Sequence, residues 1–516
     1  MYSLPLQLAY GLFSFFAPAA LDNGLVVQTA QGQVQGTLLE NGNRQFLGIP
    51  FAADTSKYRF RAPQAPPTHS QILDASGWGD SCPPDLGPSA QAFLKIAGLL
   101  DQQLNVTKSE NCLNLNIWAP ATTRPQNTAV MIWIYGGSGK FGTSNTLPYN
   151  GSFFVRDWND ITIVSINYRT NVLGFPNAPG TWNVGLLDIE YAIQWVYKNI
   201  GNFGGDPNRI VLFGESFGSL AIDAYTIRNP TDTIVKGVIL ESGLMALDEF
   251  IAPNSTQWPL LAAAVGCGNS NNVMQCMQAV PYSLLEGGII KNSLSFTAGI
   301  DNYTMFADWK YYVDHGMYLR VPTLLGNNAN EGDMFVAAYE ATGGTLPEHI
   351  TFDEASAACT DVLFHCPAFQ SAKLRVETGA TTWRYIYSGV FDNINNGNKT
   401  LRAFHTAEIP MVFQTYNFST FTHFPATPVE ISLSKYIQGG WVAFARNPSL
   451  ALDNYNWRRF VVNDILHPSI NVLGGPENPA SVTYERTADH DAGCSELDDL
   501  IPIVLPIIKH LNGHTF

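Results

Sequence analysis

Charged residues are scarce in this sequence, and basic residues are the scarcer kind. Lys, Arg, Asp and Glu make up 14% of the chain, with 28 basic against 43 acidic residues and a formal net charge of −15. Proteins that bind phosphate backbones or anionic membrane surfaces through long-range attraction carry the opposite balance. We therefore expect no nucleic-acid partner.

Long apolar runs are also missing, apart from one at the N-terminus. The stretch from Leu4 to Phe16 is too short to span a bilayer, and Ala17-Pro-Ala-Ala after it has the small-x-small form of a signal-peptidase site. The usual Lys or Arg before such a run is absent. We expect residues 1–19 to be a signal peptide and the protein to be secreted.

The rest of the chain contains no sign of a second domain or of a membrane anchor. No linker rich in Pro, Ser and Gly interrupts residues 20–516, so we expect one catalytic domain there. The stretch from His510 to Phe516 is polar, and no stable membrane anchor is expected. Glycosylation sequons agree with export, at Asn105, Asn150, Asn254, Asn302, Asn398 and Asn417.

Cysteine pairs of the C-x-x-C type are absent, which excludes the common zinc and dithiol redox patterns. Seven cysteines in an exported chain are typical of disulfides with one thiol left over. Proximity along the chain favours Cys82 with Cys112 and Cys267 with Cys276. One further bond and one free thiol remain among three residues: Cys359, Cys366 and Cys494. We expect no metal ion and no organic cofactor.

The chain does contain ample material for a core, with 46% hydrophobic residues. Helical spacing of apolar residues runs from Leu187 to Asn199. Short apolar, β-branched runs predict buried strands at Val130–Tyr135, Ile161–Tyr168, Ile210–Phe213, Val238–Leu240 and Val321–Leu325. Strands that alternate with helices predict an α/β fold, with a large, mostly parallel central sheet flanked by helices. The Gly-punctuated segment Gln33–Phe51 predicts a small antiparallel edge near the N-terminus.

The strongest motif is Gly214-Glu-Ser216-Phe-Gly218, which follows the predicted strand at Ile210–Phe213 and precedes a helix-like segment. This G-x-S-x-G pattern between strand and helix is typical of a nucleophile elbow. The two glycines allow strand and helix to approach closely because neither has a Cβ. We predict that Ser216 is the catalytic nucleophile of an α/β-hydrolase fold.

A serine hydroxyl needs a histidine base, and the histidine needs a carboxylate that fixes its tautomer. In this fold the three follow one another in the order Ser, acid, His. Glu331 lies in a polar loop after the strand at Val321–Leu325 and is the predicted acid. His405, which follows the strand-like Trp383–Tyr387, is the predicted base, and His490 is the alternative.

Acyl transfer also needs hydrogen-bond donors for the oxyanion of the tetrahedral intermediate. The loop Gly136-Gly-Ser-Gly139 follows a predicted buried strand, as a donor loop of this fold does. We predict that the oxyanion hole consists of the backbone N–H groups of Gly137, Ser138 and Phe217.

With these motifs, the chain resembles the type-B carboxylesterase/lipase family, which includes cholinesterases and fungal secreted lipases. The resemblance runs from about Val26 to Trp441. Besides the elbow and the glycine loop, it rests on Phe46-Leu-Gly-Ile-Pro-Phe-Ala, Ser109-Glu-Asn-Cys-Leu-Asn-Leu-Asn-Ile-Trp, Asn202-Phe-Gly-Gly-Asp-Pro and Leu240-Glu-Ser-Gly.

The resemblance implies the α/β-hydrolase fold and the same triad, oxyanion hole and two disulfides. It also implies structural ion pairs between Arg169 and Asp188 and between Arg59 and Glu110. In this family Phe217 replaces a usual Ala and Ser138 a frequent Gly or Ala. The bulkier side chains predict a narrower oxyanion hole.

The predicted activity is hydrolysis of a carboxylic ester, in a small molecule or a lipid, through an acyl-enzyme. Lipase and short-chain esterase remain alternatives. The loop closed by Cys82 and Cys112 contains the helix-like stretch Ala90–Leu104, which is either a mobile lid or a helix packed over the pocket. The alternative function is that of a catalytically silent, cholinesterase-like adhesion or binding protein.

Overall fold

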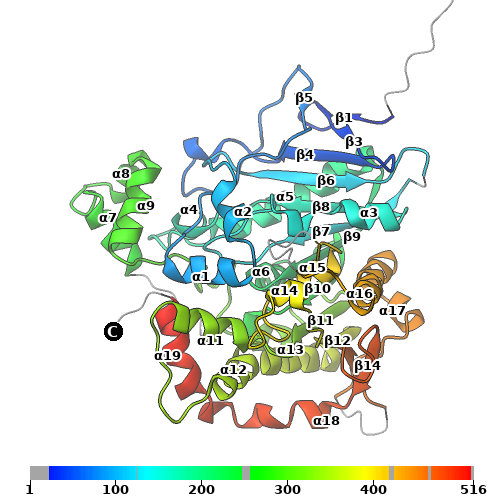
Figure 1. Ribbon diagram of the computed structural model, residues 1–516. Helices are drawn as coiled ribbons and strands as arrows, with labels where there is room; N and C mark the ends of the chain where they lie inside the picture. Colours follow the sequence, from blue (N-terminus) through cyan, green and yellow to red (C-terminus); the bar gives the residue numbers. More distant parts are fainter. Residues whose placement is uncertain (1–22, 125, 247–255, 418–423, 463–466, 513–516) are drawn as a thin grey trace, which may run out of the picture.

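The structure, a computed structural model, describes residues 23–124, 126–246, 256–417, 424–462 and 467–512 (Figure 1). The predicted signal peptide and the sequon at Asn254 lie outside the described residues. Within these ranges, none of the helices combines the length and the apolar character needed to cross a membrane.

A large sheet runs through the molecule and, in the described chain, has eleven strands. Their spatial order is β14 (Val482–Glu485), β13 (Ile470–Leu473), β12 (Thr382–Tyr387), β11 (Thr323–Asn328), β10 (Val235–Glu241), β9 (Gly205–Glu215), β7 (Thr128–Ile134), β8 (Ile161–Ile166), β6 (Asn114–Ala119), β4 (Arg44–Pro50) and β3 (Thr37–Leu38). Figure 1 shows these strands stacked from the blue N-terminal strands at the top to β14 near the bottom.

The strands from β13 to β8 are parallel to one another, whereas both edges of the sheet are antiparallel. At one edge β6, β4 and β3 pair antiparallel, and at the other β14 does so with β13. A separate small sheet consists of β1 (Val26–Gln28), β2 (Gln33–Gln35) and β5 (Leu73–Asp74). The predicted α/β fold with an antiparallel N-terminal edge is confirmed.

Every residue of β6, β7, β8 and β12 is buried. Strands β7 and β8 are accordingly nearly continuous apolar runs, whereas β6 and β12 also bury polar side chains such as Asn116 and Arg384. Each predicted strand forms, with shifted ends. Strand β9 begins before the predicted Ile210 because Gly205 already pairs with Thr128 of β7.

Helices cover the sheet. Helix α5 (Val184–Asn199) and helix α6 (Phe217–Arg228) pack against β9, and α16 (Pro428–Arg446) packs across β7, β9 and β10. Helix α16 starts with a capping box, because the Thr427 side chain accepts the N–H of Glu430 while the Glu430 side chain accepts that of Thr427.

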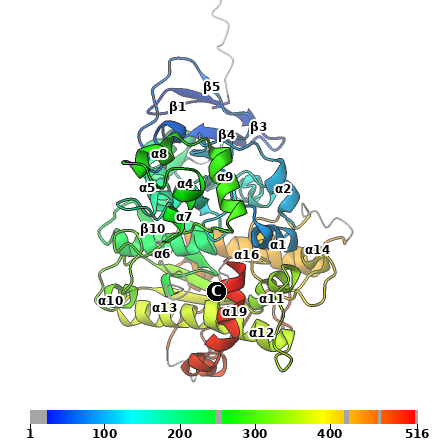
Figure 2. The ribbon, with the colours of Figure 1, turned by 90° about the vertical axis from the view of Figure 1, so that its left-hand side faces the viewer.

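The other described α-helices lie around this core and in the connections between strands. They are α1 (Pro88–Ile96), α2 (Leu100–Asn105), α3 (Ser152–Asp157), α4 (Asn171–Gly174), α7 (Gln257–Ala264), α8 (Val273–Ala279), α9 (Tyr282–Lys291), α10 (Trp309–Asp314), α11 (Gly332–Ala341), α12 (Phe352–Thr360), α13 (Cys366–Glu377), α14 (Asp392–Asn395), α15 (Ile409–Val412), α17 (Ala451–Asn454), α18 (Thr487–His490) and α19 (Ile501–Leu511). Helices α1 and α19 both contact α11, and the three lie together on the face seen in Figure 2.

Disulfides and buried ion pairs tie distant segments together. Cys82 is bonded to Cys112 and Cys267 to Cys276, as predicted, and Cys366 is bonded to Cys494, which leaves Cys359 as a buried free thiol.

Both ion pairs implied by the resemblance also form. Arg169 Nη2 lies 2.6 Å from Asp188 Oδ1, and Arg59 Nε donates to Glu110 Oε2 at 2.7 Å. Of the two, the pair of Arg169 and Asp188 is the more deeply buried.

Candidate active site

Ser216 lies in a sharp turn between β9 and α6. Its backbone angles, φ 55° and ψ −123°, fall in a region that L-residues rarely adopt. A Cβ on Gly218 would lie 2.0 Å from the carbonyl oxygen of Ile134, and one on Gly214 would lie 2.6 Å from the same atom. The two glycines therefore let the turn press against β7, and the turn is the nucleophile elbow expected from the motif.

Glu331 and His405 are directly joined. Glu331 follows β11 at the start of α11, and its Oε2 lies 2.6 Å from His405 Nδ1. Its other oxygen accepts the Ser242 hydroxyl at 2.5 Å and the backbone N–H of Asn328 at 2.6 Å. Three donors thus converge on one fully buried carboxyl group and hold it in place. With Nδ1–H donated to this carboxylate, Nε2 is left as the basic nitrogen of a neutral imidazole.

The His405 ring is held tightly. It is 5% exposed, and its centroid lies 4.8 Å from the ring of Phe364 and 5.4 Å from that of Phe335. Nε2 lies 3.2 Å from Oε1 of Glu215, the residue before the nucleophile, although this contact lacks hydrogen-bond geometry. Burial raises the pKa of Glu215 well above its ordinary value. Burial thus favours the uncharged form of this neighbouring carboxyl group.

Ser216 and His405 line the same cavity, together with the glycine loop. Among the described hydrogen bonds there is none between the Ser216 hydroxyl and the imidazole. Catalytic hydrogen bonds are often long or misaligned before substrate binds and tighten in the complex. The structure thus brings the three predicted triad residues into one site, in which Glu331 and His405 are already bonded.

The predicted oxyanion donors are free to bind a ligand. Gly137 and Ser138 adopt φ 101° and 56° in the turn after β7, and the carbonyl of Gly137 accepts the N–H of Lys140 at 2.9 Å. Phe217 is the first residue of α6, where a backbone N–H has no partner within the helix. In the described chain, none of these three N–H groups has an acceptor. They therefore offer unused donors beside the nucleophile.

The bulky ring of Phe217 packs into the protein beneath the glycine loop. Its centroid lies 5.4 Å from that of Phe175 and 6.1 Å from that of Tyr168. A Cβ on Gly139 would lie 3.0 Å from the edge of the Phe217 ring. The side chain thus supports the loop that carries two of the predicted donors.

Three further buried carboxyl groups surround the acid, and sequence analysis did not identify their role. Glu215, Glu241 and Glu408 are each at most 1% exposed. Burial raises the pKa of Glu241 well above its ordinary value, and burial with the negative charge of Glu331 raises the pKa of Glu408 to about 8. Burial thus favours the uncharged form of all three carboxyl groups.

A second cavity shares Ser138, Ser216 and Phe335 with the first. His405 lines the first cavity, whereas Phe217 and Leu220 line the second. The first cavity is walled on one side by α1 and the turn after it, through Phe93, Leu94, Ala97 and Leu99. The segment closed by Cys82 and Cys112 thus covers the site, and its movement as a lid stays a prediction.

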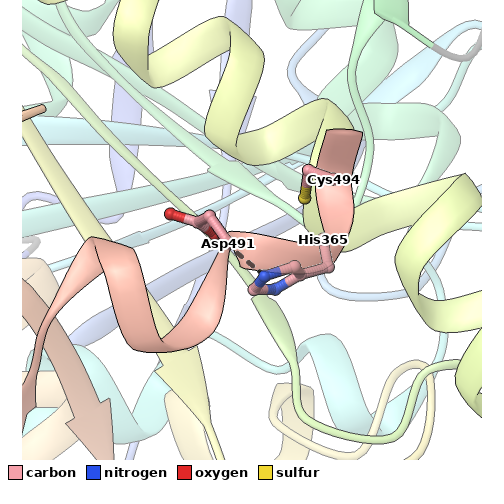
Figure 3. Close-up of side chains that lie close together, drawn as sticks. All are labelled: His365, Asp491 and Cys494. Carbon is pink, nitrogen blue, oxygen red and sulfur yellow. Dashed lines mark ion pairs between the residues drawn. The ribbon is translucent and has the colours of Figure 1, made fainter. Parts of the chain in front are cut away.

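His490, the alternative base, pairs with Glu485 near the end of the chain. Close by, His365, Asp491 and Cys494 place potential metal ligands near one another (Figure 3). Cys494 is bonded to Cys366, so its sulfur is no thiolate, and both Asp491 oxygens accept hydrogen bonds from the Arg384 guanidinium at 2.7 and 2.8 Å. This cluster fits a structural link rather than a metal site.

Comparison with known proteins identifies the family. The model of the carboxylesterase family matches residues 23–349 and 345–472. The chain belongs to the carboxylesterase family. It is accordingly a carboxylic ester hydrolase, which agrees with the elbow and with the Glu331–His405 pair.

Relatives of this carboxylesterase span most of its length. Secreted lipase 5 of Gibberella zeae is 34% identical over 401 residues, which are 70% of this chain and 72% of the relative. The chlorogenic acid esterase of Aspergillus niger is 34% identical over 453 residues, 84% of this chain and 85% of the relative. A solved structure of PNB esterase is similar with a TM-score of 0.71 and 25% identity, and the match covers 92% of this chain and 99% of that one.

Proposed function

We propose that this carboxylesterase cleaves esters through an acyl-enzyme on Ser216, with His405 as general base and acid and Glu331 as the residue that orients the imidazole. One observation carries the proposal. Ser216, on a strained elbow, lines one cavity with His405, whose Nδ1 is hydrogen-bonded to the buried Glu331. Beside it lie three backbone N–H groups that have no acceptor among the described residues.

In the first half of the reaction, Ser216 Oγ attacks the ester carbonyl while His405 Nε2 takes the hydroxyl proton. The oxyanion that forms accepts hydrogen bonds from Gly137, Ser138 and Phe217. The bond from the carbonyl carbon to the alcohol oxygen then breaks, and His405 returns its proton to that oxygen. In the second half, water attacks the acyl-enzyme in the same way and releases the carboxylic acid.

The two cavities suit the two halves of the ester. The alcohol oxygen must lie near His405 to receive its proton, so the alcohol half belongs in the first cavity, which His405 lines. The acyl half then occupies the second cavity, which contains Ser216 but not His405. The substrates are small-molecule or lipid esters, and we further propose that the enzyme acts outside the cell, where its three disulfides are stable.

Replacement of the nucleophile tests this proposal. Ser216→Ala should lower kcat for 4-nitrophenyl acetate at least about 10⁴-fold with an unchanged melting temperature, whereas Ser432→Ala, at an exposed position on α16, should keep full activity. More than a tenth of the wild-type rate in Ser216→Ala would show that the nucleophile is another residue. A folded wild-type protein that cleaves no ester of any chain length and resists fluorophosphonates would be a binding protein instead.

A further inference from the structure

Lys140 is a buried cation close to the nucleophile. It follows the glycine loop directly, its side chain is 7% exposed, and it lines the second cavity together with Ser138 and Ser216. Lysine is rarely buried without a partner of opposite charge, because burial removes the water that solvates its ammonium group. Such a position therefore indicates that the charge has a use.

Among the described residues, little compensates for this charge. The Lys140 ammonium donates to the side-chain oxygen of Asn512 at 2.9 Å, which occupies one of its three N–H donors. Asp85 acts on it electrostatically, but the described residues contain no carboxylate at ion-pair distance. Burial lowers the pKa of Lys140 to about 8, so the group is still mostly charged at neutral pH. Two charged N–H donors thus have no acceptor among the described residues.

The backbone around Lys140 is firmly held. Its N–H donates to the carbonyl of Gly137 at 2.9 Å, and its own carbonyl accepts the N–H of Asp85 at 2.7 Å. The neighbouring carbonyl of Ser138 accepts the Thr297 hydroxyl at 2.5 Å. The backbone of Lys140 is therefore fixed relative to the predicted oxyanion hole, and the bond to Asn512 positions its ammonium group.

The second cavity is mostly apolar, and besides Lys140 its polar lining residues are Ser138, Ser216, Thr297 and Asn512. Side chains of Phe217, Leu220, Phe335, Leu363, Phe364 and Ile508 line it, and Lys140 is the only charged residue in its described lining. An apolar chamber with one cation is complementary to a hydrocarbon chain or ring that ends in an anion.

We propose that Lys140 binds a carboxylate carried by the acyl group, so that the substrates of this enzyme include half-esters of dicarboxylic acids. The inference rests on the proposed function, because it places the acyl half in the second cavity. A carboxylate supplies the acceptor that two ammonium N–H groups lack and offsets the cost of the buried charge. The hydrocarbon between carboxylate and ester packs against the phenylalanine and leucine side chains.

The test compares two substrate series in the full-length enzyme. The first contains monoethyl esters of unbranched dicarboxylic acids from butanedioic to decanedioic acid, and the second contains the ethyl esters of the unbranched monocarboxylic acids of equal length. Release of ethanol gives kcat/KM for each pair. Wild-type enzyme should favour the half-ester at the chain lengths that reach Lys140. The quantity compared between variants is the ratio of kcat/KM for the half-ester to kcat/KM for the neutral ester of equal length.

Lys140→Met keeps an unbranched side chain that is one atom shorter and removes its charge. It should lower kcat/KM for the preferred half-ester about 10- to 100-fold and change the neutral ester by no more than about twofold. Asn512→Asp, which keeps the lysine but gives it a carboxylate partner, should lower the ratio in the same direction. Lys310→Met removes an exposed charge beside Trp309 and is the matched control, with an unchanged ratio.

The pH dependence separates a binding role from a structural one. The preference for the half-ester should fall as the pH rises through about 8, where Lys140 loses its proton. Asp85 and His510 are the other titratable groups in the neighbouring outer cavity. His510→Gln should keep the midpoint, whereas Asp85→Asn, which removes an attractive charge, should lower it.

Two results would overturn the inference. One is an unchanged ratio in Lys140→Met at every chain length, and the other is a charge effect confined to substrates whose carboxylate lies on the alcohol half. Failure of the proposed function looks different, because wild-type enzyme would then cleave neither series, or Ser216→Ala would cleave both.

Discussion

Replacement of Glu331 by Gln tests whether Glu331 fixes the tautomer of His405, because the new side chain has the same shape. In the protein, Glu331 Oε1 accepts the backbone N–H of Asn328 and the Ser242 hydroxyl, and Oε2 accepts His405 Nδ1–H. A hydroxyl can rotate, but the N–H of Asn328 is fixed as a donor. The Gln oxygen must therefore face Asn328, and its NH₂ group faces His405.

An NH₂ group at that position can only donate, so Nδ1 must become the acceptor and the proton moves to Nε2. The imidazole is then in the tautomer that cannot take the proton of Ser216. The same change in a Ser-His-Asp hydrolase costs about 10⁴ in kcat, which is about 5.4 kcal/mol of barrier at 1.36 kcal/mol per factor of ten. We expect a loss of that size in this enzyme, with little change in KM because Glu331 is buried away from the substrate.

The assay is steady-state hydrolysis of 4-nitrophenyl acetate by Glu331→Gln, with the melting temperature measured on the same samples. Glu340→Gln, at an exposed position on the same helix α11, is the matched control and should behave as wild type. A kcat within about tenfold of wild type in a folded Glu331→Gln protein would refute the reasoning, because general-base catalysis alone contributes about 10²- to 10⁴-fold.

Three further predictions concern the elbow, the disulfides and the buried acids. Gly218→Ala should lower the free energy of unfolding by about 3 kcal/mol and abolish activity, because the new Cβ would overlap the Ile134 carbonyl. Gly201→Ala is the control, because its Cβ meets no atom, and denaturation and rate measurements should show stability and activity unchanged. The double variant Cys366→Ser/Cys494→Ser opens a loop of 128 residues, and its free energy of unfolding in urea denaturation should fall by about 5 kcal/mol. Cys267→Ser/Cys276→Ser opens a loop of only 9 residues and should lose about 2.5 kcal/mol. Equal losses in the two variants would contradict this order. Because the pKa of Glu408 is raised to about 8 in the folded protein, folding takes up a proton and stability falls as the pH rises from about 5 to about 8. Glu408→Gln should weaken that fall by up to about 1.4 kcal/mol per pH unit, and an unchanged slope would mean that Glu408 does not carry the proton.

The parts of the site that were predicted from the sequence are those with a local signal. The elbow needs Gly214 and Gly218 at fixed spacing around Ser216, and strand and helix follow directly on either side. The oxyanion loop is likewise a short segment after a buried strand. Glu331 and His405 were placed by their order along the chain, and the sheet brings them within 2.6 Å of each other although 74 residues separate them.

The parts that were not predicted depend on contacts between distant segments. Glu215, Glu241 and Glu408 come from three separate elements, and single glutamates in a sequence usually indicate exposed positions. Only the assembled sheet shows that they gather around Glu331. The same holds for Lys140, whose burial depends on Asn512 at the end of α19. Likewise, proximity along the chain could not choose among three cysteines, because the fold places Cys366 and Cys494 with their Cα atoms 5.4 Å apart.

Covalent labelling tests the central claim most directly. After reaction with a fluorophosphonate and digestion with trypsin, the peptide from Ile210 to Arg228 should carry one phosphonyl group, and fragment ions should place it on Ser216 rather than on Ser219. Esterase activity should fall in proportion to that label and be lost completely when labelling is complete. A label on another residue that accompanies the loss of activity, or full activity in protein labelled at Ser216, would contradict it.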